Sequence, residues 1–95
     1  MKLHIIVTQD DIDKAGGGAE NCPIAQSMRR TYADPRITTV IAGQGWLFYC
    51  YEQSRYIQAS TPEKAAQFIT DYDTRGKKYV QPFEFDAEFG KLTKP

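Results

Sequence analysis

Chemistry in this chain could come from Cys22, which precedes Pro23 at the predicted start of a helix. A helix N-terminus stabilises a thiolate, and this placement is typical of reactive cysteines. A nucleophile also needs a base, and His4, the only histidine, falls in a predicted strand with nothing in the sequence to bring it beside Cys22. We therefore predict a packed, inert thiol, no catalytic residue and no enzyme. A cysteine-dependent enzyme using Cys22 is kept as an alternative.

The chain offers few ligands for a metal ion or a phosphate. Two cysteines and one histidine fall short of a four-ligand zinc site. Asp10, Asp11 and Asp13 lack the glycine and the distant glutamate of a calcium loop, so electrostatics at a helix start explains them better. Residues 16–18 are three glycines ahead of a helix, but they match neither phosphate-binding frame. We predict no metal and no cofactor.

Arginines and tyrosines supply the side chains for a binding surface. These residue types dominate protein interfaces. The same types can stack single-stranded bases and follow phosphates, so a small nucleic-acid-binding module is the alternative function. The predicted partner-binding residues are Arg29, Arg30, Tyr49, Tyr51, Arg55 and Tyr56.

The length and charge of the chain limit its number of domains and the kinds of partner it can attract. With 95 residues and a hydrophobic fraction of 41%, the chain fits one domain over 1–95, with a flexible C-terminal end from about residue 90. Twelve basic residues balance twelve acidic ones, so no overall field draws the protein to nucleic acid or to a membrane. No segment approaches the roughly 20 apolar residues of a membrane span, and no signal peptide is recognisable. We expect a cytoplasmic protein with free Cys22 and Cys50.

The best specified element is the helix that carries Arg29 and Arg30. Asn21 is its predicted N-cap, and Pro23 falls in the first turn, where a missing amide is harmless. The helical period places the two arginines on its polar side. The predicted buried face consists of Ile24, Ala25, Met28 and Tyr32.

The other elements follow from periodicity and turn residues. Thr8 is the predicted N-cap of a short helix. Thr61–Pro62 is the predicted cap of a later helix, which ends at Arg75–Gly76. The predicted strands are 1–8, 37–42, 46–51, 55–59 and 79–86, and the predicted helices begin at 9, 22 and 62. The fold class is α+β: a single small domain with a four- to five-stranded, mainly antiparallel sheet and two or three helices packed on one face. The first strand is expected beside the last.

Strand 46–51 carries bulky side chains on both faces. Trp46, Phe48 and Cys50 alternate with Leu47, Tyr49 and Tyr51. Either the strand is covered on both sides, or one set forms an exposed aromatic platform for a partner. The sequence leaves these alternatives open.

The motif Cys-Pro-Ile-Ala-x-x-x-Arg-Arg at residues 22–30 is followed by a β-meander over 37–59. Phe-Ile-x-x-Tyr-Asp at 68–73 and Pro-Phe-x-Phe at 82–85 complete the pattern. In these features the chain resembles a group of small uncharacterised proteins encoded by bacteriophages and prophages.

This resemblance implies a non-enzymatic, phage-derived accessory protein in the cytoplasm of a bacterial host. Small phage proteins of this kind commonly bind and inhibit a host protein or complex, for example as anti-CRISPR-like, anti-defence factors, or they serve the phage's own DNA or RNA metabolism. No membrane partner is expected. A homodimer formed by edge-strand pairing is a further alternative.

Overall fold

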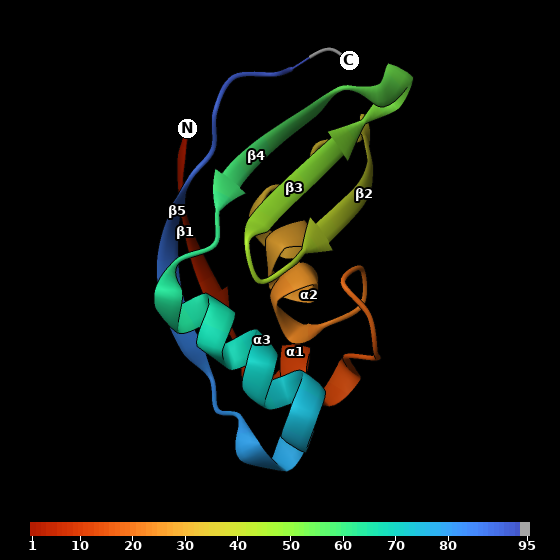
Figure 1. Ribbon diagram of the computed structural model, residues 1–95. Coiled ribbons are helices and arrows are strands. Elements are labelled where there is room, and N and C mark those ends of the chain that lie inside the picture. The colour runs from red at the N-terminus through yellow and green to blue at the C-terminus, as the bar shows by residue number, and fades with distance from the viewer. Residues whose placement is uncertain (94–95) are drawn as a thin grey trace.

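The structure is a computed structural model that describes residues 1–93, and it confirms the α+β class (Figure 1). Short 3₁₀ turns at Glu52–Ser54 and Lys77–Tyr79 join some of the elements. In chain order the elements are β1 (Lys2–Val7), α1 (Gln9–Lys14), α2 (Pro23–Thr31), β2 (Ile37–Ala42), β3 (Trp46–Tyr51), β4 (Tyr56–Ser60), α3 (Glu63–Arg75) and β5 (Phe83–Glu88).

The strands form two antiparallel sheets, one of β1 and β5 and one in the order β2-β3-β4. The expected pairing of the first strand with the last is therefore confirmed. The expected single sheet is divided, because β5 packs beside β4 without pairing with it and the recorded backbone hydrogen bonds to β4 on this side come from the segment after β5. Gly90 N–H donates to the Gln58 carbonyl at 3.0 Å, and Thr93 and Tyr56 exchange backbone hydrogen bonds of 2.8 and 3.1 Å.

The C-terminal end is bonded as far as the structure describes it. Gly90 and Thr93 make backbone hydrogen bonds to β4, and the flexibility expected from about residue 90 stays a prediction. Residues 94–95 lie outside the described part. At the same corner, Met1 and Phe89 exchange backbone hydrogen bonds of 2.7 and 2.8 Å, which extends the β1–β5 ladder.

The core lies between the sheets and the helices. α2 packs against both β1 and β2, and α1 packs against α2; Figure 1 shows α2 behind the three-stranded sheet. Phe68 of α3 stacks on Phe83, with ring centroids 4.7 Å apart. Apolar positions at period 3.6 in α2 and period 2 in the strands face one another. The largest fully buried side chains include Ile5, Ile12, Ile24, Met28, Leu47, Tyr49 and Phe89.

The helix ends partly follow the sequence predictions. Thr8 caps α1 in a complete capping box with Asp11, as expected. The prediction for Asn21 is wrong: Cys22 is the N-cap of α2 and makes no side-chain cap, because Pro23 occupies the first helical position. Gly76 ends α3 at φ 89°, as expected.

The last strand is shorter than predicted. It begins at Phe83, not Tyr79, because residues 77–79 form a 3₁₀ turn. Pro82 thus precedes the ladder and does not have to donate to it.

The turn between β3 and β4 holds two residues in the left-handed region. Gln53 has φ 62° and Ser54 has φ 58°. Non-glycine residues are rare in this region because Cβ crowds the backbone, and two successive left-handed residues favour Asn-Gly. The hairpin tip is therefore strained.

We predict that the double variant Gln53→Asn, Ser54→Gly raises the free energy of unfolding by about 1 kcal/mol, since both new residues tolerate this backbone. Urea denaturation measures it. The control Gln81→Asn repeats the first of these two changes at an exposed residue outside the left-handed region, and it should leave the free energy of unfolding unchanged. No gain in the double variant, or an equal gain in the control, would contradict the strain.

Candidate functional site

The six predicted contact residues do not share one surface, and Tyr49 is not on a surface at all. Its side chain is fully buried, and its hydroxyl donates to the Met28 carbonyl at 2.6 Å. Burial raises the pKa of this phenol. The prediction that Tyr49 contacts a partner is therefore corrected: the Leu47 and Tyr49 side of β3 faces α2, and a helix carbonyl already satisfies the hydroxyl.

Arg30 is engaged within the protein. Its guanidinium donates two hydrogen bonds to the Asp11 carboxylate, one of them 2.9 Å long, and a third of 2.7 Å to the Ile6 carbonyl. The Asp11 side chain is only 5% exposed. Burial alone would raise the pKa of Asp11, but the hydrogen bonds from Arg30 and from the Thr8 backbone outweigh it and lower the pKa. Arg30 thus ties α2 to α1 and β1.

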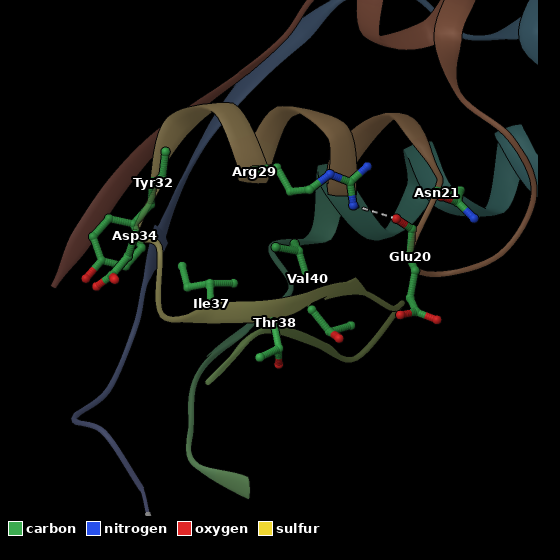
Figure 2. A pocket seen from close by; sticks show the side chains of 10 residues that line it. Glu20, Asn21, Arg29, Tyr32, Asp34, Ile37, Thr38 and Val40 are labelled. Carbon is green, nitrogen blue, oxygen red and sulfur yellow. Dashed lines mark hydrogen bonds between the residues drawn. The ribbon is translucent and has the colours of Figure 1, made fainter. Parts of the chain in front are cut away.

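Arg29 is exposed and borders an open groove of about 420 Å³ between α2 and β2. Its guanidinium donates to the Glu20 carbonyl at 2.7 Å, as the dashed line in Figure 2 shows. Ile37 and Val40 point from β2 toward α2 in the same view, and Thr38 points away. The groove is lined by Glu20, Asn21, Arg29, Tyr32, Ala33, Asp34, Ile37, Thr38, Thr39 and Val40.

Tyr51, Arg55 and Tyr56 all lie near the strained tip of the β3–β4 hairpin. They do not share a face: Tyr56 pairs with Cys50 on the outer side of the sheet, whereas Tyr51 belongs to the inner side of β3 with Tyr49. The Tyr51 hydroxyl donates to the Tyr32 hydroxyl at 3.3 Å. The Arg36 guanidinium lies 5.8 Å from the centroid of the Tyr51 ring. Tyr51 and Arg55 also line a small cavity of about 180 Å³ with Arg36 and Leu92.

The outer face of the β2-β3-β4 sheet answers the question that the sequence left open. On β3, Trp46, Phe48 and Cys50 point away from the core, and Trp46 is 50% exposed. Phe48 contacts Tyr56 of β4 edge to face, with centroids 5.7 Å apart. No helix in the described chain lies over these residues (Figure 1). The sequence shows this alternation, but the predicted partner-binding residues include Tyr49, on the inner side of β3, and omit Trp46.

Cys22 and His4 do not form a pair. Cys22 is 4% exposed, and burial raises the pKa of its thiol, so the helix N-terminus does not yield a thiolate. His4 lies on the outer face of the β1–β5 sheet, where its Nδ1 is 2.7 Å from Asp86 and its Nε2 is 3.0 Å from Glu84. Both cysteines are free.

Among the described residues, no three His, Cys, Asp or Glu side chains are grouped as a metal site would require. Within residues 1–93, no helix has the length and apolar character needed to cross a membrane. The candidate site is therefore a surface, made of the outer sheet face and the neighbouring α2–β2 groove.

Comparisons with protein-family models, with curated proteins and with solved structures find no match.

We predict that Arg30→Ala lowers the free energy of unfolding by about 2 to 3 kcal/mol, because it leaves the buried Asp11 carboxylate without its cation. The loss is below that of a fully buried pair, since Arg30 is 50% exposed. Urea denaturation at neutral pH measures it. The neighbouring control Arg29→Ala should change stability by less than about 0.5 kcal/mol; similar losses in both variants would contradict the structural role of Arg30.

We predict that the pKa of His4 lies above its ordinary value of 6.5, and that of Asp86 below 3.8, because the two groups are hydrogen bonded across β1 and β5. The His4 hydrogen bond to Asp86 is the main cause of the raised pKa; desolvation opposes it, and the hydrogen bond and charge of Glu84 add to it. The stabilisation by His4 is complete below pH 6.5 and is lost as pH rises through its raised pKa. The stabilisation by ionised Asp86 is complete above pH 3.8 and is lost as pH falls through its lowered pKa.

NMR titration of the imidazole measures this shift directly. In the His4→Gln variant, the free energy of unfolding should no longer fall as pH rises through the raised pKa of His4. An imidazole pKa at or below 6.5 would contradict the pairing.

Proposed function

We propose that this chain is a non-enzymatic binding protein and that the outer face of its β2-β3-β4 sheet contacts a partner protein. The observation that carries the proposal is Trp46, half exposed on a rigid strand with no helix of the described chain over it. Phe48 and Tyr56 extend the aromatic surface. Trp, Tyr and Arg are the residue types that most often dominate the energy of protein interfaces.

The exposed half of Trp46 is enough for an anchor. A tryptophan buries about 150–250 Å², so covering the remaining half removes about 100 Å² from water and contributes about 2.5 kcal/mol. Because a tryptophan side chain has only two rotatable bonds, little side-chain entropy is lost when it is immobilised on binding. A partner with one matching pocket would therefore gain much of its affinity here.

The resemblance to phage-encoded proteins supports a bacterial host protein or complex as the partner. Binding would occlude a working surface of that complex, and the chain would act as a stoichiometric inhibitor. An anti-defence role, anti-CRISPR-like, belongs to this proposal.

The nucleic-acid alternative finds less support in the arrangement of charge. Several cations already have acidic neighbours: Lys14 with Asp10, Arg30 with Asp11 and Arg36 with Asp34. Backbone phosphates need several available cations in a row. The enzyme alternative is likewise less supported, because the buried Cys22 thiol has a raised pKa.

We predict that the immobilised protein retains one host complex from a bacterial lysate, and that Trp46→Ala weakens the retention at least 10-fold through loss of the aromatic anchor. Quantitative mass spectrometry measures it. Tyr79→Ala is the matched control, because Tyr79 is 63% exposed and lies outside the outer sheet face. Equal retention by Trp46→Ala and wild type would contradict the proposed face, and retention that nuclease treatment and salt abolish would favour nucleic acid.

A further inference from the structure

β2 is an edge strand whose outer backbone groups are only partly used. Ala42 directs its N–H away from β3 and donates to the Ala19 carbonyl at 2.9 Å. Backbone direction repeats every second residue in an antiparallel pair, so the N–H and carbonyl of Val40 point the same way. Within residues 1–93, neither group of Val40 has a hydrogen-bond partner on that side.

The edge of β2 also lacks the features that prevent strand addition. Natural edge strands are protected by lysine, by proline or by inward-pointing charges. The six residues of β2, Ile-Thr-Thr-Val-Ile-Ala, include none of these. Five of its six residues are β-branched, which favours pairing in a sheet. Val40 itself is only 2% exposed, and it lines the groove beside α2.

The α2–β2 groove runs beside this edge and limits what could pair with it. At one end, Ala19 already bonds to Ala42, and Glu20 and Asn21 line the groove; at the other end lie Tyr32 and Asp34. Figure 2 shows Glu20 near one end of β2 and Asp34 near the other. A short extended segment fits between such ends better than the whole edge of a second sheet.

Arg29 indicates the chemistry of such a segment. Among residues 1–93, the only hydrogen bond of its side chain goes to the Glu20 carbonyl, so other guanidinium N–H groups are available. Asp34, at the far end, is already neutralised by Arg36 at 2.7 Å. An acidic side chain placed opposite Arg29 would therefore find a donor.

We propose that the α2–β2 groove binds an extended peptide segment of the partner protein, which adds to the edge of β2 through main-chain hydrogen bonds to Val40 and places an acidic residue against Arg29. This proposal rests on the proposed function, because it assigns the segment to the same partner. Main-chain bonding would give affinity, and the Arg29 contact would give selectivity. The added strand would also extend the sheet that carries Trp46.

The test uses a displayed library of random ten-residue peptides, selected on the full chain. We expect enriched peptides with an acidic residue at a fixed position, and slower hydrogen exchange at the Val40 amide in their presence. With Arg29→Glu as bait, the enriched position should become basic. Arg30 is unsuitable as a bait variant, since its loss would disturb the fold.

An amide-to-ester replacement at Val40 isolates the main-chain bond, because it removes the N–H and keeps the buried side chain. Cys22 and Cys50 allow the chain to be assembled from three synthetic segments by ligation. The ester at Val40 should weaken a selected peptide about 3- to 10-fold, the effect of one hydrogen bond. An ester at Phe48 of β3, which does not line the groove, should leave the peptide affinity of the folded protein within twofold.

Three results would overturn the inference: no enriched peptide, enriched peptides that leave exchange at Val40 unchanged, or a concentration-dependent dimer that alone protects Val40, which would assign the edge to a second copy. The ester also separates this inference from the proposed function in the lysate experiment. If Trp46→Ala loses the host complex and the Val40 ester keeps it at full strength, the groove proposal fails and the binding face stands. If Trp46→Ala keeps the complex and the ester weakens its retention, the outer face fails and the groove stands.

Discussion

The contact on which the fold most depends is the one between Arg30 and Asp11. Asp11 closes the capping box of α1, and its nearly buried carboxylate receives the guanidinium of Arg30 from α2. The same guanidinium reaches the Ile6 carbonyl of β1. Three elements thus meet at one ion pair, which ties α2 to α1 and to β1. Arg30 therefore supports the fold beside the groove and is not among the residues that line it.

Much of the fold follows from local signals in the sequence. β2 and β3 have the predicted bounds, Gly76 ends α3, and Thr8 caps α1, because periodicity, glycine and capping residues act over a few positions. The division into two sheets was not predictable, since it depends on where the segment after β5 meets β4. Asn21 failed as a cap because Pro23 set the helix start one residue later.

The candidate site was less predictable than the fold. Residue type correctly indicated that arginines and aromatics are available, but the sequence does not tell which side of β3 faces the helices. For that reason the prediction placed Tyr49 on the binding surface and omitted Trp46, whereas Tyr49 is buried and Trp46 is exposed. Likewise, no sequence pattern tells that Arg30 pairs with the distant Asp11 while Arg29 keeps N–H groups for a partner.

The meeting of Met1 with Phe89 has a topological consequence. β1 enters the sheet at the corner where β5 leaves it, and their backbones exchange two hydrogen bonds there. A connection across this corner would turn β1 and β5 into consecutive strands of one hairpin, and the chain could then be opened at the strained tip around Gln53 without cutting any ladder. The order of elements along the chain is therefore separable from their arrangement in space, and the binding face could be presented from a rearranged sequence with new ends.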